Sequence, residues 1–161
     1  MTTQAAALHR TDISTSALAE ICSVRLDNAL FGVPIRHILE IVGSARPQPV
    51  PLAPRFVGGL VHYRGEVLTT VCLRQLLGLP LLDEPQDILI LENSGGCYGL
   101  LVDEVGEVLT LATADHEPNP STLDENRKDL LAGAYKLKGS LLVMLAPERL
   151  DPIRLGAARA A

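Results

Sequence analysis

The feature that most constrains the fold is an internal duplication of a unit of about 70 residues. Phe31–Val42 aligns with Tyr98–Leu109 at matching aromatic, glycine and apolar positions. Val57–Leu76 aligns in the same way with Leu131–Leu150. The connector between the two blocks is longer in the second copy, where a loop absorbs an insertion at small entropic cost. A unit that occurs only twice predicts two similar halves rather than a solenoid.

Most of the apolar pattern in each half has the period of short strands. Alternation over residues 22–26 precedes an Asp27-Asn28 turn, and Gly95-Gly96 lies between the strands of a second predicted hairpin. Residues 67–73 and 141–145 are continuous apolar runs, as expected of strands buried on both faces. Helices are expected only as one or two turns, at residues 35–39, 54–60, 73–77, 102–105 and 147–150.

These patterns predict an all-β fold with a few short helices, built as two small β-barrels. Neither copy is large enough to bury itself, so we expect the barrels to share a hydrophobic core. A Pro-rich connector separates the first hairpin of each copy from its last strand, which leaves open whether the halves exchange strands. Residues 1–19 and 151–161 are expected to be tails, the first of them disordered, which leaves residues 20–150 as the domain.

Composition narrows the class of partner. The chain of 161 residues is 47% apolar and 20% charged, with a net charge of -5, five aromatic residues and no Trp. A globular protein is indicated, and nucleic acid is argued against as a partner. Cys22, Cys72 and Cys97 show no paired spacing, so a reducing cytoplasm fits. No apolar run approaches the roughly 20 residues of a membrane span, so direct membrane insertion is not expected.

Two constellations suggest chemistry, and each has a simpler interpretation. Cys72 with His37 or His62 would make a thiol nucleophile and its base, but Cys72 lies in the apolar run VLTTVCL, which favours a core residue. His37 and Glu40, with His116-Glu117, offer metal donors without a further ligand at a recognisable spacing. Phosphate-loop and hydrolase motifs are absent from the sequence. We therefore expect neither catalysis, nor a metal, nor a cofactor.

The remaining candidate is Arg64-Gly65, in the tract FVGGLVHYRGEVL. An arginine here is a fork-shaped donor for a carboxylate, with Glu40 as a candidate partner. An exposed pair of this kind contributes only about 0–1 kcal/mol to stability. A role for this pair would therefore lie in binding a partner rather than in stabilising the fold.

Five segments in order resemble the CheW-like coupling domains of bacterial chemotaxis signalling. They are FGVPIRHILEIV, PLAPRFVGGLV, YRGEVL with CLRQLLGL, YGLLVDEVGEVLTL, and the segment that ends in LLVMLAPERL. The resemblance extends from Glu20 to about Leu150. It implies two five-stranded SH3-like β-barrels that share a hydrophobic core, in agreement with the duplication.

The resemblance implies a non-catalytic, cytoplasmic adaptor that couples chemoreceptors, the methyl-accepting chemotaxis proteins, to a CheA-type histidine kinase. The chemoreceptor cytoplasmic hairpin tip would lie in a groove between the barrels, and the CheW-like regulatory domain of the kinase would pack barrel against barrel. The isolated protein would be monomeric and would assemble into receptor–kinase arrays at the inner face of the membrane. By motif, the partner-binding residues are Ile38, Glu40, Arg64 and Gly65, and the turn and packing residues are Gly59, Gly99, Gly106 and Gly133.

The sequence departs from the family pattern at four positions near Arg64. His62-Tyr63 replaces Asn-Leu, Thr69 replaces Pro, and Cys72 replaces Asp. A paralogue that serves another receptor–kinase pathway, such as surface motility or second-messenger control, would also look like this. A small thiol-dependent enzyme that uses Cys72 is the third alternative.

Overall fold

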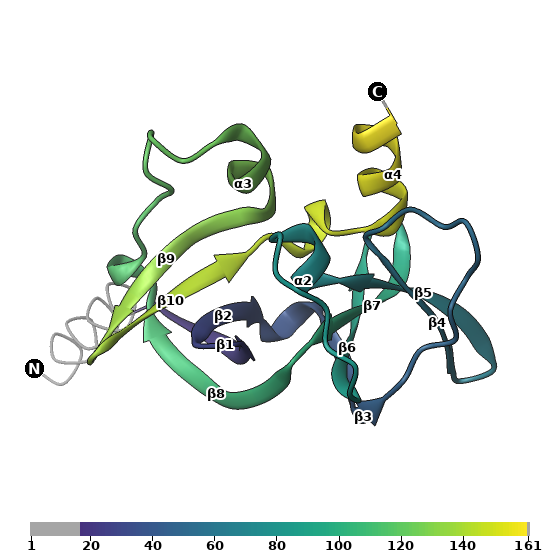
Figure 1. The fold of residues 1–161 in the computed structure, drawn as a ribbon. Coiled ribbons are helices and arrows are strands. Elements are labelled where there is room, and N and C mark those ends of the chain that lie inside the picture. The colour runs from purple at the N-terminus through teal and green to yellow at the C-terminus, as the bar shows by residue number, and fades with distance from the viewer. Residues whose placement is uncertain (1–16, 161) are drawn as a thin grey trace, which may run out of the picture.

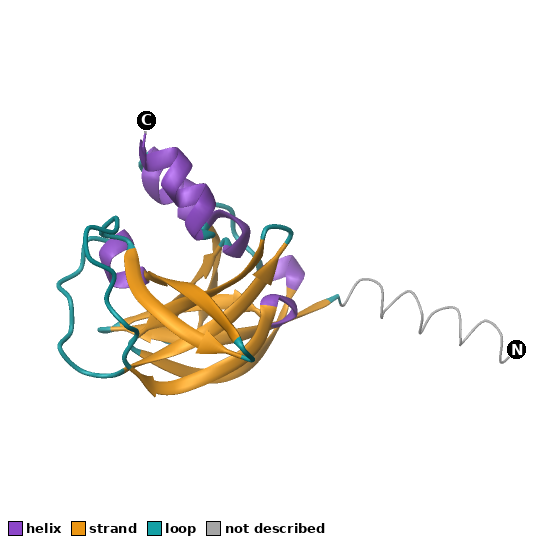
Figure 2. Cartoon of the chain, turned by 90° about the vertical axis from the view of Figure 1, so that its right-hand side faces the viewer, coloured by secondary structure: helices purple, strands orange, loops and turns teal. Residues whose placement is uncertain are grey.

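The computed structural model describes residues 17–160, over which ten strands form two five-stranded sheets (Figure 1). The strands are β1 (Leu18–Leu26), β2 (Ala29–Pro34), β3 (Ile38–Ala45), β4 (Val57–Tyr63), β5 (Glu66–Cys72), β6 (Gln86–Asn93), β7 (Gly96–Val102), β8 (Glu104–Ala112), β9 (Leu131–Leu137) and β10 (Ser140–Leu145). The helical segments are η1 (Ile35–His37), α2 (Leu73–Leu76), η2 (Thr113–Asp115), α3 (Glu125–Leu130), η3 (Pro147–Arg149) and α4 (Pro152–Ala160). Figure 2 shows these helices at the periphery of the strands.

The two sheets have the same strand order when β1–β5 of the first copy are matched with β6–β10 of the second copy. The order is β8-β1-β2-β10-β9 in the first sheet, called barrel 1, and β3-β6-β7-β5-β4 in the second, called barrel 2. Each barrel contains the first hairpin of one copy and the last three strands of the other. All neighbouring strands are antiparallel except β2 with β10 and β5 with β7. The predicted all-β fold is confirmed, and the structure shows that the halves exchange strands.

The parallel strand pairs of the two barrels align equivalent residues of the two copies. Met144 of β10 pairs with Gly32 of β2, and Thr70 of β5 pairs with Gly99 of β7. A Cβ atom on Gly99 would lie 2.9 Å from methyl carbons of both Thr70 and Ile88. Glycine at this position therefore allows the two parallel strands to approach closely, and Gly32 has the same role in barrel 1.

The connector in each copy touches an edge strand through one bridging pair of residues. Gln48 pairs with Leu60 of β4, and Glu117 pairs with Ala134 of β9. The residue before each strand partner, Gly59 or Gly133, has a φ of +123° or +92°. A Cβ on Gly59 would also lie 2.6 Å from the Gln48 carbonyl oxygen. Both the backbone conformation and the close connector exclude a larger side chain here.

The core has one shared part and two separate parts. The shared cluster lies between the barrels and takes buried residues from both copies, among them Leu26, Leu73, Leu89, Tyr98 and Leu150. Smaller clusters fill the interior of barrel 1 (Ile21, Tyr135, Leu142 and Met144) and of barrel 2 (Tyr63, Leu68, Ile88, Ile90 and Leu101). The shared cluster is the core that the duplication predicts, because each copy alone would leave it exposed.

Two of the five predicted helical segments are wrong. One-turn helices occur where predicted at η1, α2 and η3, but residues 54–60 lead into β4, and residues 102–105 join β7 to β8. The sequence prediction missed η2 and α3, which lie in or beside the second connector. Val57 and Val102 satisfy a helical spacing locally, yet both belong to strands whose ladders supply more backbone hydrogen bonds than one helical turn would.

The C-terminal segment also differs from the expected tail. Asp151 accepts a hydrogen bond from the Ile153 backbone N–H at 2.8 Å, and the helix α4 begins at Pro152. Leu155 is buried in the shared cluster. At least to Leu155 the chain is part of the folded domain, because a capped helix carries one large apolar side chain into the core. Of the expected N-terminal tail, residues 1–16 lie outside the described residues, whereas Leu18 and Ala19 belong to β1.

Candidate partner-binding site

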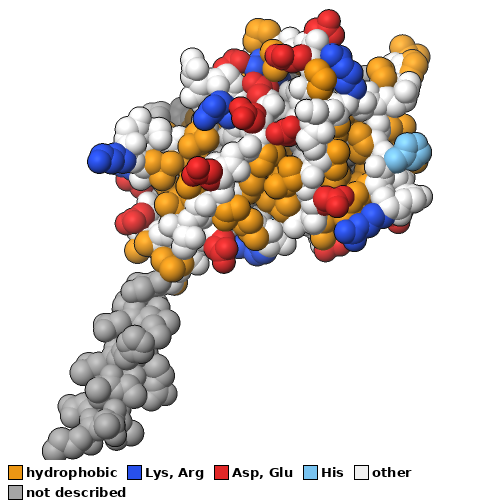
Figure 3. All heavy atoms as spheres, turned by 90° about the horizontal axis from the view of Figure 1, so that it is seen from below, with side chains coloured by type: hydrophobic (Ala, Val, Ile, Leu, Met, Phe, Trp, Pro, Cys, Tyr) orange, Lys and Arg blue, Asp and Glu red, His pale blue; other side chains and the backbone are white. Residues whose placement is uncertain are grey.

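One side of the molecule carries β3 and β8, along the lower edge of Figure 1. Seen from that side, hydrophobic side chains gather near the centre of the surface, with acidic and basic side chains around them (Figure 3). The large exposed apolar residues on these two strands are Leu39, Ile41 and Val108, which are 43, 48 and 52% exposed. We call the surface formed by these three residues the β3–β8 face. Apolar groups gathered on one exposed side suit contact with another protein.

The local structure of β3 determines which of its residues face outward. A register shift between Ile38 and Glu40 marks a β-bulge, which leaves Leu39 out of the ladder. Ile38 is half-buried and packs on the shared core, whereas Glu40 is exposed. Of the two β3 residues assigned to partner binding by the resemblance, only Glu40 therefore lies fully at the surface. The exposed apolar groups come from its two neighbours, Leu39 and Ile41.

Strand β8 repeats this arrangement in the second copy. In the alignment of the two copies, Val108 is the equivalent of Ile41, and Glu107 is the equivalent of Glu40. Both glutamates are exposed on their strands. The β3–β8 face thus takes Ile41 and Val108 from equivalent positions of the two copies, and in each copy a glutamate precedes this residue in the sequence.

Strand β8 is held closely by β1, its neighbour in the same sheet. Ser23 of β1 donates a hydrogen bond from its hydroxyl to the Glu107 carbonyl oxygen at 2.7 Å. A Cβ on Gly106 would lie 2.6 Å from that hydroxyl oxygen. Gly106 therefore makes room for the side chain that joins β1 to β8.

The β4–β5 turn presents the second set of predicted residues. Arg64 and Gly65 both have positive φ values, +49° and +80°, as in the tight turns favoured for two-residue hairpins. The Arg64 guanidinium carbon lies 5.1 Å from the centre of the Tyr63 ring, a cation–π contact that orients the side chain along the turn. Val67, at the start of β5, is 56% exposed beside it. The turn thus offers a cation and an exposed apolar group together.

The second copy carries a similar turn at the far end of barrel 1. Lys138 and Gly139 connect β9 to β10, with Leu141 49% exposed beside them. Leu141 is the equivalent of Val67 in the alignment of the two copies. Each barrel therefore ends in a turn with a basic residue, a glycine and one exposed apolar side chain.

The structure does not bring Arg64 and Glu40 together, contrary to the expected pair. They lie at opposite edges of the strand order in barrel 2, Glu40 on β3 and Arg64 after β4. Among residues 17–157, whose side chains the structure describes, neither forms an ion pair. The expected pair does not form because Glu40 lies at the β-bulge near the start of β3, whereas the chain approaches β4 only after the end of β3, where Gln48 pairs with Leu60.

Cys72 has the environment of a core residue. It is 7% exposed, and its backbone N–H donates to the Phe56 carbonyl oxygen at 2.7 Å where β5 passes into α2. Among the described residues no hydrogen bond joins its thiol to His37 or His62. The same part of the chain holds no group of three or more His, Cys, Asp or Glu side chains arranged to bind a metal ion.

The sequence analysis missed a buried ion cluster centred on Arg74. This residue is 2% exposed, and its guanidinium donates to both Asp103 carboxylate oxygens, at 2.7 and 2.6 Å. It also donates to Asp27 and to the Pro80 carbonyl oxygen. The cluster joins α2 to the β1–β2 turn and to the β7–β8 corner. An arginine inside the apolar run CLRQLL is the signal that would have indicated a buried pair.

The cluster shifts the ionisation of both partners. Burial opposes the charge on Asp103, but the hydrogen bonds from Arg74 and from the Asp27 backbone outweigh it and lower the pKa of Asp103. The hydrogen bond to Asp103 is the main reason that the pKa of Arg74 is raised. Both groups therefore remain charged in a place where an unpaired charge would be costly.

Fold and surface together define a duplicated two-barrel module that presents exposed apolar groups at equivalent positions of its copies. The family model described as the CheW-like domain matches residues 20–152. The chain belongs to the CheW-like domain family. The resemblance found in the sequence is thereby confirmed.

Individual relatives support the same assignment. The chain is 26% identical over 140 residues to the chemotaxis protein CheW of Rhizobium meliloti (strain 1021), a match covering 86% of this chain and 90% of that protein. It is 30% identical over 122 residues to the chemotaxis protein CheW of Helicobacter pylori, covering 74% and 73%. The crystal structure of the scaffolding protein TtCheW from Thermoanaerobacter tengcongensis matches with a TM-score of 0.72 and 25% identity, over 81% of this chain and 90% of that one.

The helices of the described chain are all too short or too polar to cross a membrane.

Proposed function

We propose that this chain is a non-catalytic adaptor that couples chemoreceptors to a CheA-type histidine kinase. Membership of the CheW-like domain family supports the class of function. The observation that carries the proposal is the β3–β8 face, where the two copies expose apolar residues at equivalent positions. An apolar surface with carboxylates beside it suits a helical partner that also carries basic residues.

The chemoreceptor cytoplasmic hairpin tip is assigned to the β3–β8 face. Leu39, Ile41 and Val108 supply apolar contacts from both barrels, and the exposed Glu40 and Glu107 precede Ile41 and Val108 in the sequence. A helical hairpin placed here would contact both copies at once. Its affinity would come mainly from burying the three apolar side chains, with the glutamates adding orientation.

The regulatory domain of the kinase is assigned to the β4–β5 turn. Arg64 is exposed and unpaired among residues 17–160, and Val67 is exposed beside it. An exposed arginine adjacent to an apolar group has the composition of an interface hot spot. The two assigned surfaces have no residue in common, so both partners would be bound at the same time.

A paralogue serving a different receptor–kinase pathway is the alternative, and one observation favours it. Of the four positions that depart from the family pattern, Tyr63 and Cys72 are buried, Thr69 is half-buried, and only His62 is fully exposed. His62 precedes the Arg64 turn on β4. A change of partner would thus act through the surface assigned to the kinase. The thiol-enzyme alternative is not pursued, because Cys72 is buried.

The test measures binding of the full chain to a receptor hairpin tip and to a kinase regulatory domain separately. Ile41→Ser should weaken binding to the tip about thirtyfold or more and leave kinase binding unchanged, since an interface hot spot commonly contributes about 2 kcal/mol. Arg64→Ala should do the reverse. Ile153→Ser and Arg154→Ala, at exposed positions on α4, serve as matched controls.

Two outcomes would contradict the assignment. If Ile41→Ser and Ile153→Ser bind the tip equally well, the β3–β8 face is not the receptor surface. If Arg64→Ala lowers the melting temperature strongly but binds the kinase normally while folded, the turn is structural. Cys72→Ala should retain binding of both partners, and loss of function in a folded Cys72→Ala protein would restore the thiol hypothesis.

A further inference from the structure

The duplication creates two equivalent corners with reversed charges. In the alignment of the two copies, Asp103, the residue after β7, is the equivalent of Arg36 of η1. Arg74 of α2 is likewise the equivalent of Glu148 of η3. One corner therefore carries an acid after its central strand and a base on its one-turn helix, and the other carries the opposite arrangement.

The Arg74–Asp103 corner is closed by its own side chains. The guanidinium and the carboxylate meet in two hydrogen bonds of 2.6 and 2.7 Å, and Gln86 donates to the same carboxylate at 3.3 Å. Only 3% of the Arg74 side chain and 16% of the Asp103 side chain are exposed. Arg74 also donates to Asp27, so its charge is neutralised by carboxylates of the corner itself.

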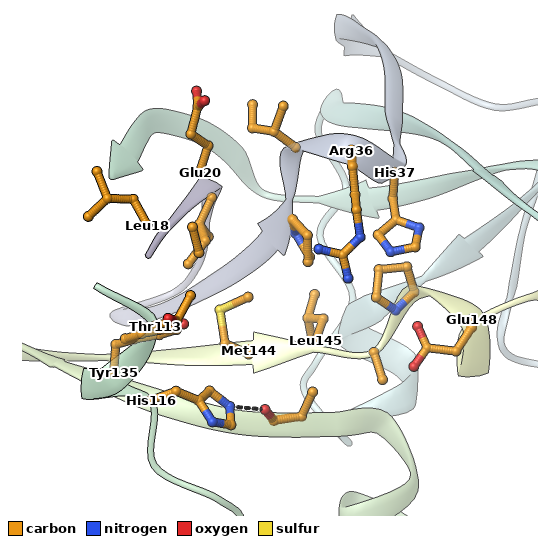
Figure 4. A pocket seen from close by; sticks show the side chains of 17 residues that line it. Leu18, Glu20, Arg36, His37, Thr113, His116, Tyr135, Met144, Leu145 and Glu148 are labelled. Carbon is orange, nitrogen blue, oxygen red and sulfur yellow. Dashed lines mark hydrogen bonds between the residues drawn. The ribbon is translucent and has the colours of Figure 1, made fainter. Parts of the chain in front are cut away.

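The Arg36–Glu148 corner is open. In the described chain no ion pair joins these two residues, and they line a cavity of about 530 Å³. Figure 4 shows the Arg36 side chain extending into this cavity from one side and the Glu148 side chain reaching toward it from the other, with Met144 and Tyr135 further along the wall. Both charged side chains are exposed at the rim, whereas Met144 and Tyr135 are buried.

We propose that this cavity binds a free α-amino acid with an apolar side chain. The carboxylate of such a ligand fits the guanidinium fork of Arg36, and its ammonium fits the carboxylate of Glu148. Its side chain would lie on the apolar floor formed by Ile21, Tyr135 and Met144. The ligand would thereby supply the link that Arg74 and Asp103 make by themselves in the other corner.

The charge pattern distinguishes this ligand from simpler ones. A monocarboxylate would leave Glu148 beside it without a partner, and an amine would leave Arg36 without one. A zwitterion satisfies both groups and adds no net charge to the corner. The cavity volume also lies within the roughly 300–1,000 Å³ range of small-molecule sites, which have an apolar lining and a few polar groups. This inference is independent of the adaptor function proposed above.

The chain offers a direct probe of binding. Its two methionines are Met1 and Met144, and Met144 lines the cavity. With isotope-labelled methionine methyl groups in the full chain, we expect titration with leucine to shift the Met144 methyl signal in a saturable way. Isocaproate lacks the ammonium of leucine and isoamylamine lacks its carboxylate, so each should bind at least about tenfold more weakly.

Variants assign the two charged contacts. Arg36→Gln and Glu148→Gln should each weaken leucine binding by about tenfold or more, because each removes one charge-assisted contact. Arg154→Gln and Glu66→Gln, which change exposed charges elsewhere, should bind leucine like the parent chain. Melting temperatures check that all four variants are folded.

Three results would overturn the proposal: no saturable shift of the Met144 signal at millimolar leucine, equal binding of leucine and isocaproate or isoamylamine, or unchanged binding in both Arg36→Gln and Glu148→Gln. The analogue comparison uses the unaltered chain, so it decides the question even if a variant fails to fold. None of these results would bear on receptor or kinase binding.

Discussion

Barrels 1 and 2 share strand order, parallel pair and close-packed glycine, but they differ in how their corners and connectors are completed. In the corner after β7, Arg74 and Asp103 form a buried pair, whereas Arg36 and Glu148 at the equivalent positions stay apart. The second connector is longer and contains α3, whose Leu130 is buried in the shared core. The duplication thus preserves the strands, which both barrels need, while the corners and connectors are free to acquire separate roles.

The largest expected effect follows from the difference between the corners. Arg74→Ala leaves Asp103 buried without its partner and should lower the free energy of unfolding by about 3–5 kcal/mol. Glu148→Ala, at the equivalent exposed position, should change it by less than about 1 kcal/mol. Urea unfolding of the two variants measures the contrast. Similar values for both would show that the Arg74 cluster is not the stabilising feature of its corner.

Acid should remove the same contribution. The pKa of Asp103 is lower in the folded chain than in the unfolded chain, so its stabilisation is present above the unfolded value of about 3.9 and is lost as pH falls toward the folded value. In that window the unfolded state binds more protons, so stability rises with pH. The difference in unfolding free energy between the parent chain and Asp103→Asn should therefore shrink from neutral pH to about pH 3. A constant difference would refute this linkage.

A second contrast concerns the chain after η3, which has no counterpart in the first copy. Leu155→Ala removes a buried side chain from the shared core and should reduce stability by about 2–4 kcal/mol. Ile153→Ala, on the exposed side of the same helix, should have little effect. Thermal unfolding of both variants provides the comparison. Equal and small effects would mean that α4 is a dispensable tail after all.

The smallest effects are expected to be equal in the two barrels. Gly32→Ala and Gly99→Ala each place a methyl group against side chains of a neighbouring strand, at 2.7 and 2.9 Å from the nearest atoms. Each should reduce the free energy of unfolding by about 1–3 kcal/mol, as overpacking of a core usually does. Urea unfolding measures both. A much larger effect in one barrel would show that the two parallel strand pairs are not equivalent in packing.

Local sequence patterns predicted much of the fold. The β1–β2 and β6–β7 hairpins, the strands β5 and β10, and the short helices η1, α2 and η3 all follow from alternation, continuous apolar runs and turn residues. Burial of β5 and β10 on both faces was predicted too broadly, because Val67 and Leu141 at their starts are exposed. The failures have a common origin. Val57 and Val102 match a helical spacing over a few residues, and only pairing with distant strands shows that they are extended.

In the candidate site, too, local patterns predicted some features, and others depended on contacts between distant strands. The motif placed Glu40 and the Arg64-Gly65 turn at the surface, where the structure also places them. Their supposed contact with each other depended on how β3 and β4 are aligned across the barrel, and the chain approaches β4 only after β3 has ended, at Gln48. Ile41 and Val108 could be recognised as equivalent from the repeat, but not as parts of one exposed face.

By itself, the sequence determined that the chain is duplicated, that each copy is made mainly of strands, and that it resembles the CheW-like family. Repeats, periodicity and motifs can be recognised from the order of the residues alone. Only the tertiary structure decided that the copies exchange hairpins, that Arg74 meets Asp103, and that Arg36 and Glu148 remain apart. These outcomes depend on which distant segments come together in the folded chain, and no local pattern expresses that.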